Sequence, residues 1–146
     1  MKKTLTALVV LLLIICSGIS VYAQGIEWET LNDEVMSLYR QGRYDRAVIV
    51  AKRALQVAEK AVGPDHPSVA TSLNNLAELY HTQGQYAQAE PLCKRSLAIR
   101  EEAFGPDHLS VATILENMAV LYRNTGRENE AKELDKRAAA IRAIMR

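Results

Sequence analysis

Residues 63–70 read Gly63-Pro64-Asp65-His66-Pro67-Ser68-Val69-Ala70, and residues 105–112 read Gly105-Pro106-Asp107-His108-Leu109-Ser110-Val111-Ala112. The second stretch repeats the first at an offset of 42 in the numbering (105 − 63). When residues 63–104 are set against 105–146 without a gap, 21 of 42 positions carry the same residue. A self-match at a fixed period of this length is typical of proteins built from stacked repeats. Because such arrays usually act as binding surfaces, the repeat indicates how the protein works without naming its partner.

The first 23 residues, Met1–Ala23, have the features of a secretory signal peptide. Two lysines precede an apolar run at about residues 5–15, and a more polar stretch leads to Ala23. This pattern predicts cleavage after Ala23 and export to the periplasm or the medium. The alternative is an uncleaved N-terminal anchor, although the run is short for a membrane span of about 20 residues. A lipoprotein signal at Cys16 is less consistent, because Ile15 before it is not a small residue.

The composition of residues 24–146 excludes several classes of partner. Without Lys2 and Lys3 the chain has 16 basic and 17 acidic residues, a net charge of −1 (16 − 17). This balance gives no electrostatic attraction to nucleic acid or to an anionic membrane surface. Cys93 is the one cysteine in this part of the sequence. An intrachain disulfide is therefore excluded, and the thiol is either hidden or paired between chains.

Apolar residues recur at helical spacing on both sides of Gly42, Gly84 and Gly126. Each glycine is expected to end one helix and precede another, which predicts three helix-turn-helix units at about residues 27–62, 66–104 and 108–146. The first unit matches the others if its turn is one residue shorter, so that Leu38 aligns with Leu79. One pair cannot bury its apolar face alone, so the pairs are expected to stack. The predicted fold class is all-α, with one domain at residues 24–146.

The spacing of these residues resembles a tetratricopeptide repeat, through Leu76-Ala77-x-x-Tyr80, Gly84, Ala89 and Ser96. The 42-residue period, with Gly-Pro-Asp-His between units, is similar to the longer repeat of kinesin light chains and their bacterial relatives. The resemblance implies an α-solenoid with a right-handed superhelical stack. The chain departs from the family in the middle of the second helices, where a large residue is replaced by Ala51, Cys93 and Asp135. This departure indicates a thin core at those points.

The resemblance also implies a concave groove lined by the first helix of each unit. Carried onto this chain, the exposed positions of those helices are Asp33, Ser37, Arg40, Asn74, Asn75, Glu78, His81, Glu116, Asn117, Val120 and Arg123. Asparagine suits the binding of an extended peptide, because its amide offers both a donor and an acceptor. The alternative for each of these residues is an ordinary solvated helix face.

Several other interpretations have less support. One subclass of these repeats grips chaperone C-termini with Lys and Arg, but Asp33 and Thr113 stand where those cations are needed. The loop pairs Asp65-His66 and Asp107-His108 offer fewer ligands than the three or four of a stable metal site. They are better explained by an aspartate that caps the next helix and a histidine that packs in the turn. No catalytic constellation emerges, so neither an enzyme nor a cofactor is predicted.

Basic pairs recur in the second helices as Lys52-Arg53, Lys94-Arg95 and Lys136-Arg137. They are either a basic stripe that attracts acidic partners or solvated side chains whose stems cover apolar surface. We predict an exported adaptor or scaffold that binds a protein or peptide, with no nucleic acid and no membrane contact beyond the leader. The alternative is a structural component of an envelope or secreted complex that self-associates through its repeat ends or through Cys93.

Overall fold

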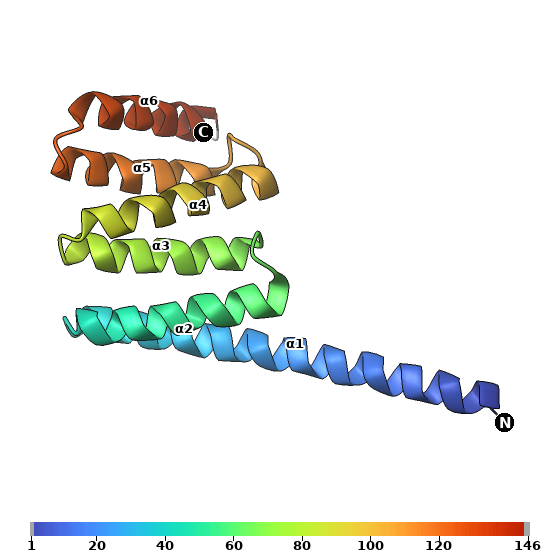
Figure 1. Ribbon diagram of the computed structural model, residues 1–146. Helices are drawn as coiled ribbons and strands as arrows, with labels where there is room; N and C mark the ends of the chain where they lie inside the picture. Colours follow the sequence, from blue (N-terminus) through green and yellow to red (C-terminus); the bar gives the residue numbers. More distant parts are fainter. Residues whose placement is uncertain (1, 145–146) are drawn as a thin grey trace.

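Six α-helices make up the chain in the computed structural model, which describes the backbone of residues 2–144 and the side chains from residue 22 to residue 144. The helices are α1 (Lys2–Arg40), α2 (Tyr44–Val62), α3 (Pro67–Thr82), α4 (Tyr86–Phe104), α5 (Leu109–Asn124) and α6 (Glu128–Ile144), with no strand among residues 2–144 (Figure 1). The predicted all-α class is confirmed. Most of the expected leader, residues 1–23, lies outside the described side chains. Within the described part, no helix has the length and apolarity of a membrane span.

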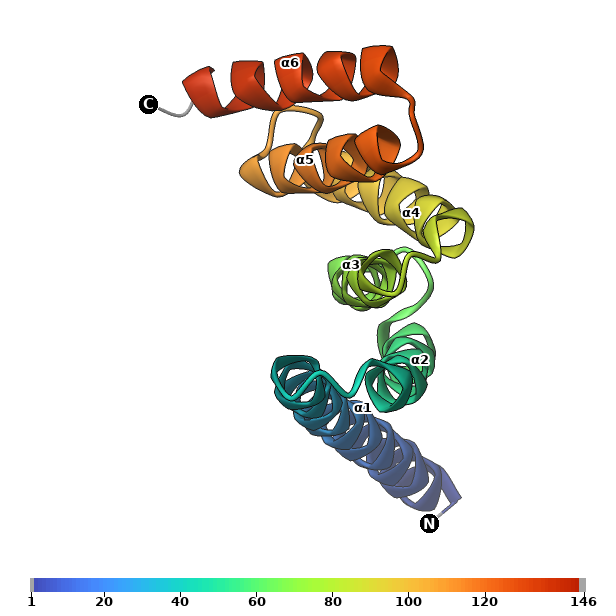
Figure 2. The same cartoon turned by 90° about the vertical axis from the view of Figure 1, so that its left-hand side faces the viewer.

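The helices pair as α1–α2, α3–α4 and α5–α6, and the pairs stack in sequence order (Figure 1). In Figure 2, α1, α3 and α5 lie along one side of the stack, and α2 and α4 lie along the other. Alanines occupy the crossing points early in the second helices: Ala47, Ala89 and Ala131 are at most 1% exposed. Such small side chains let paired helices approach closely. One apolar cluster extends from Val35 to Ala131, so the three units share a continuous core as stacked repeats require.

The turn inside each unit has the same backbone structure in all three copies. The amides of Arg43, Gln85 and Arg127 donate to the carbonyl oxygens of Leu38, Tyr80 and Tyr122 over 2.8–3.0 Å. Donors and acceptors both recur at the period of the repeat, so the turn of the first unit is as long as the turns of the other two. The predicted alignment of Leu38 with Leu79 is therefore wrong, and Leu38 occupies the place of Tyr80. The preceding glycine has φ between 70° and 76° in each copy, a backbone conformation that favours glycine.

Histidine, not aspartate, caps the first helix of the second and third units. His66 and His108 adopt the same extended backbone, with φ −78° and ψ 145°. The imidazole Nδ1 of each accepts a hydrogen bond of 3.1 Å from the amide two residues later, at Ser68 and Ser110. The prediction that aspartate caps these helices is wrong, because the capping residue is the last one outside the helix and that position belongs to histidine.

Replacing either capping histidine with alanine is expected to lower the free energy of unfolding by about 0.5–2 kcal/mol, the usual effect of losing an N-cap. The loss follows because an amide at the helix start then has no side-chain acceptor. Urea denaturation followed by circular dichroism measures it for His66→Ala and His108→Ala. Asp107→Ala is the matched control and should change stability by less than about 0.5 kcal/mol. A larger loss for the aspartate than for the histidines would contradict this assignment of the cap.

Arginines of the second helices join each unit to the one before it. Arg95 pairs with Glu59 at 2.7 Å and donates to the carbonyl oxygen of Pro64 at 3.0 Å. Arg137 repeats both contacts in the next unit, with Glu101 and with the carbonyl oxygen of Pro106. These guanidinium groups are occupied by the loop and helix of the preceding unit. They therefore serve the stacking of the units and do not form a free basic stripe.

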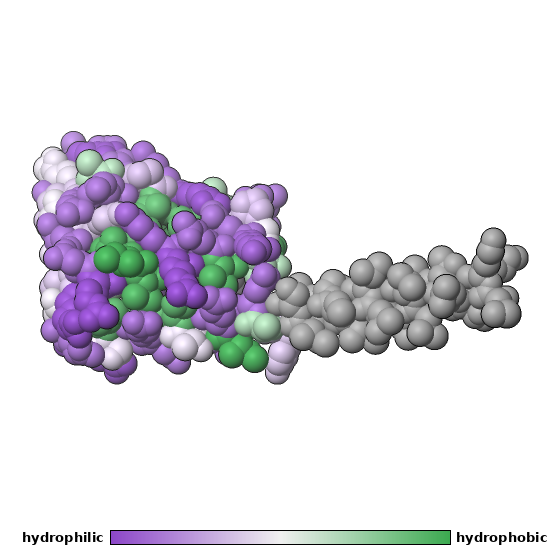
Figure 3. Space-filling model, turned by 60° about the horizontal axis from the view of Figure 1, so that its bottom comes forward, coloured by the Kyte–Doolittle hydropathy of each residue, from purple (hydrophilic) through white to green (hydrophobic). Residues whose placement is uncertain are grey.

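The outward side of α1 differs from the equivalent sides of α3 and α5. Positions that are buried in α3 as Ser72, Leu76 and Leu79 correspond, one repeat earlier, to Thr30, Glu34 and Ser37. All three of the latter are polar and at least partly exposed. Figure 3 views the stack from the side of the first unit, where hydrophilic groups separate the apolar ones. The outer side of α1 is therefore polar at these positions, although the first pair also exposes apolar side chains at Ile26, Met36 and Ile49.

Candidate functional site

A hollow of about 210 Å³ opens between the first helices of the second and third units. Three helices supply most of its wall: α3, α4 and α5. Its lining residues are Tyr39, Asn74, Ala77, Glu78, His81, Thr82, Ala89, Cys93, Asn117, Val120 and Leu121. The rim is polar and the floor is apolar. This combination suits a ligand that inserts an apolar group while its polar atoms stay near the surface.

Asparagine pairs link the first helices across the open side of the stack. The Asn75 amide donates to the Asn32 carbonyl oxygen at 3.1 Å, and the Asn117 amide donates to the Asn74 carbonyl oxygen at the same distance. At the junction beside the hollow, one amide nitrogen (Asn74) and one carbonyl oxygen (Asn117) have no protein partner among the described residues. Together they offer the donor and the acceptor that an extended peptide backbone needs.

Side chains of neighbouring first helices also pair at the C-terminal end of these helices, with the same spacing in sequence. The Tyr39 hydroxyl lies 3.4 Å from the Thr82 hydroxyl, and the His81 Nε2 lies 2.7 Å from the Asn124 amide nitrogen. Each pair is 43 residues apart, as are the asparagine pairs. The repetition shows that α1, α3 and α5 present equivalent positions to one another, with Asn32 in the place of Asn74 and Tyr39 in the place of His81.

The floor of the hollow lies at Cys93, one of the positions where a thin core was predicted. The Cys93 side chain is 4% exposed. Burial, with a smaller effect from the charge of Glu90, raises the pKa of the Cys93 thiol to about 11. The thiol is therefore protonated at neutral pH, and this lowers its reactivity towards other thiols and disulfides. Its small volume leaves the space that the hollow occupies.

Five of the predicted groove residues lie together on the hollow: Asn74, Glu78, His81, Asn117 and Val120. Asn75 lies on a much smaller neighbouring pocket with Met36 and Tyr39. The remaining predicted residues are engaged within the protein or lie away from both pockets. Glu116 pairs with Arg142, Arg123 pairs with Asp135, Ser37 accepts from Gln41, Arg40 donates to the Met36 carbonyl, and Asp33 borders neither pocket.

The first-unit residues Ser37 and Arg40 follow from the shifted alignment, and the correct register replaces them with Met36 and Tyr39. Sequence reasoning also missed Asn32 as the partner of Asn75. The turn glycines are spaced by 42 residues throughout. Applying this offset to the first unit would have identified Asn32, Met36 and Tyr39. Among the described residues, no three His, Cys, Asp or Glu side chains converge as metal ligands would.

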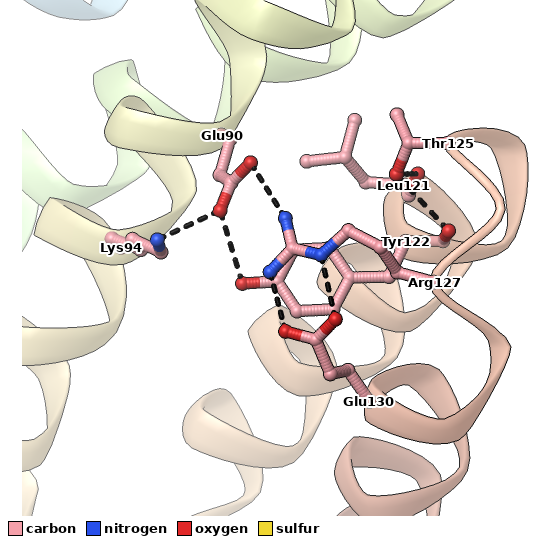
Figure 4. A network of polar contacts seen from close by, with 7 residues as sticks. All are labelled: Glu90, Lys94, Leu121, Tyr122, Thr125, Arg127 and Glu130. Carbon is pink, nitrogen blue, oxygen red and sulfur yellow. Dashed lines mark hydrogen bonds and ion pairs between the residues drawn. The ribbon is translucent and has the colours of Figure 1, made fainter.

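A polar network beside the hollow holds the third pair against the second (Figure 4). Glu90 on α4 accepts from Lys94 at 2.7 Å and from Arg127 at 2.9 Å. The Arg127 guanidinium also binds both carboxylate oxygens of Glu130 and lies 3.6 Å from the centre of the Tyr122 ring. Hydrogen bonds from Lys94 and Arg127 lower the pKa of Glu90 to about 2. The network is specific to this junction, because Val48 stands at the position equivalent to Glu90 in the first unit.

Glu90→Gln is expected to lower the free energy of unfolding by about 1–2 kcal/mol at pH 7. The folded-state pKa of Glu90 is depressed from 4.5 to about 2, so its contribution is present above pH 4.5 and is lost as the pH falls towards 2. The difference between wild type and variant should therefore shrink across that interval in urea denaturation series. Glu102→Gln, an exposed position on the same helix, is the control. A difference that stayed constant between pH 7 and pH 3 would contradict the network.

The sequence model of the tetratricopeptide repeat matches residues 29–92 and again residues 68–143. The chain belongs to the tetratricopeptide repeat family. The matches cover all three helix pairs, so the predicted family is confirmed over the whole stack. Tetratricopeptide repeat proteins are typically non-enzymatic scaffolds for interactions between proteins. The helix pairs described above and the hollow between them are thus features of a tetratricopeptide repeat array.

Solved structures of other tetratricopeptide repeat proteins resemble the chain. BtubC (BKLC) from P. vanneervenii is 26% identical with a TM-score of 0.76, and the match covers 81% of this chain and 47% of that one. A putative kinesin light chain from Podosopora anserina with nearly identical TPR-like repeats is 25% identical with a TM-score of 0.72, over 79% of this chain and 55% of that one. The predicted similarity to kinesin light chains is confirmed. The chain spans about half the length of these proteins.

Proposed function

We propose that this tetratricopeptide repeat protein is an exported, non-enzymatic adaptor that holds an extended segment of another protein against α1, α3 and α5. The observation that carries the proposal is the hollow, with its apolar floor at Cys93 and its polar rim at Asn74 and Asn117. Its volume of about 210 Å³ is close to that of one large side chain. A bound segment would place one apolar side chain in the hollow and its backbone along the asparagine pairs.

Export is supported by the leader sequence at residues 1–23, with its basic start, short apolar run and Ala23. N-terminal sequencing of the protein isolated from its native cells tests this part of the proposal. A chain that begins at Gln24 supports export with cleavage. A chain that retains Met1 supports the alternative of an uncleaved anchor.

Asn117→Ala is expected to weaken peptide binding about tenfold, which corresponds to about 1.4 kcal/mol. The reason is that this change removes one hydrogen-bonding amide from the rim and frees its partner Asn74. The measurement uses a peptide selected from a random display library against the protein, with affinities determined by isothermal titration calorimetry. Circular dichroism of both proteins confirms that the fold is unchanged.

Gln56→Ala is the matched control, because it removes the same amide group from an exposed position on α2 that lines neither the hollow nor the smaller pocket. Its affinity for the selected peptide should equal that of the wild type. Equal affinities for wild type and Asn117→Ala would remove the hollow from the binding site. Failure of several libraries to yield any binder would count against a peptide adaptor altogether.

A further inference from the structure

Glu78 on α3 lies between the hollow and the smaller pocket. Its side chain lines both of them, the hollow together with Val120 and the smaller pocket together with Met36. Glu78 is exposed, so a molecule in either pocket can reach its carboxylate. Among the described residues, this carboxylate forms no ion pair. The open side of the stack therefore presents an unpaired negative charge where two pockets meet.

Met36, Glu78 and Val120 occupy the same position in the three units, which we call the Met36–Glu78–Val120 row. They follow one another at the repeat offset of 42 (78 − 36 and 120 − 78). Met36 is 47% exposed and Val120 is 45% exposed. Across α1, α3 and α5, the row thus places an acidic side chain between two accessible apolar side chains, each of which lines a pocket.

The unpaired charges of the first helices are mostly negative. On α5, Glu116 pairs with Arg142 and Arg123 pairs with Asp135. The described side chains of α1, α3 and α5 that form no ion pair are one cation and four carboxylates: Arg40, Glu29, Asp33, Glu34 and Glu78. Their sum is −3 (1 − 4). A surface with this excess of negative charge attracts a positively charged partner.

We propose that the segment held against α1, α3 and α5 is basic, with a Lys or Arg side chain that pairs with Glu78. An apolar side chain on one side of this cation enters the hollow beside Val120, and another on the other side contacts Met36. These two contacts keep water from the ion pair and strengthen it relative to an ordinary surface pair. The inference rests on the proposed function, because it assigns the chemistry of the segment that the adaptor holds.

The spacing of the row sets the spacing of the three side chains in the segment. Axes of neighbouring helices are about 10 Å apart, and three residues of an extended polyproline II chain cover about 9 Å. Residues three apart in such a chain also point to the same side, because it has three residues per turn. The bound segment is therefore apolar, basic and apolar at every third residue.

The test uses the peptide acetyl-Leu-Ala-Pro-Lys-Ala-Pro-Leu-amide, in which proline favours the extended conformation. Its blocked ends leave the lysine as its one charge. NMR titration is expected to show that it binds the wild type about fivefold more tightly than the version with Gln in place of Lys. Glu78→Gln should remove this preference. Glu102→Gln, at an exposed position on α4 that lines neither pocket, is the control and should keep it.

Exchange of the two charges provides an independent test. Glu78→Lys is expected to bind the version of the peptide with Glu in place of Lys more tightly than it binds the original. The wild type should show the opposite order. Added NaCl should weaken the binding of the Lys peptide to the wild type and have little effect on the Gln peptide, because salt screens the ion pair. Circular dichroism checks that both variants of Glu78 are folded.

The proposal is overturned if the wild type binds the Lys and Gln peptides equally or binds neither. It is also overturned if Glu78→Gln keeps the preference for Lys, or if the charge exchange does not reverse the order. Failure here is distinguishable from failure of the proposed function. A peptide selected from a display library whose affinity depends on Asn117 but not on Glu78 would leave the adaptor role standing and remove only this assignment.

Discussion

Leu115→Ala is expected to lower the free energy of unfolding by about 2–5 kcal/mol, the range for removing a large buried side chain. Leu115 is fully buried on α5, where it belongs to a cluster with Val111, Ala138 and Ile141. These residues join α5 to α6, so the cavity would weaken the third pair directly. Because stability in a repeat array is approximately a sum over units and their interfaces, the melting transition should also broaden as the third unit opens before the others.

Chemical denaturation of wild type and Leu115→Ala, followed by circular dichroism, measures this loss. Val120→Ala is the matched control, because Val120 is an apolar residue on the same helix but is 45% exposed. The control should change stability by less than about 0.5 kcal/mol. Equal effects of the two substitutions would contradict the assignment of Leu115 to the core.

Cys93→Leu is expected to lower the affinity for the selected peptide by more than about tenfold, while the protein stays folded. The larger side chain enters the hollow from its floor and takes the space that a ligand side chain would use. Because the hollow offers about 210 Å³, the stability change should stay within about 1.5 kcal/mol. Calorimetric titration with the selected peptide, paired with thermal melting, separates the two effects.

Ala51→Leu is the control, because Ala51 is the equivalent residue of the first unit and is 1% exposed. It does not line the hollow or the smaller pocket near α1. Overpacking at this site should destabilise the protein by about 1–3 kcal/mol. Full peptide affinity in Cys93→Leu, in a protein shown to be folded, would exclude the hollow as the place where the ligand binds.

The general architecture was predictable because the repeats share many identical residues and because glycines mark the turns between the helices. Glycines recur at the same place in every turn, and each adopts the positive φ that explains its presence. The thin core at Cys93 was predictable from its small volume. It became informative only when the structure showed that neighbouring helices leave the space open.

The register of the first unit against the second was predicted wrongly, because two adjacent residues of the first unit are identical to two residues one position out of register in the second. Leu38-Tyr39 reads like Leu79-Tyr80, yet the turn hydrogen bonds equate Leu38 with Tyr80. The outward side of α1 is polar, so its residues do not resemble their buried equivalents. The prediction of the capping residue was wrong for a related reason. Asp65 and His66 are both able to cap a helix, and only the backbone angles show which residue precedes the first turn.

If α1, α3 and α5 together hold a segment of another polypeptide, that segment must change the surroundings of the residues on those helices. The most direct measurement is the backbone amide NMR spectrum of the protein with and without a selected peptide. Chemical shift changes are expected to concentrate at α3 and α5 around Asn74 and Val120. The amide resonances of exposed positions on α2 and α4, such as Gln56 and Glu102, are expected to stay unchanged. A peptide that binds with shifts confined to α2 and α4 would contradict the proposed function.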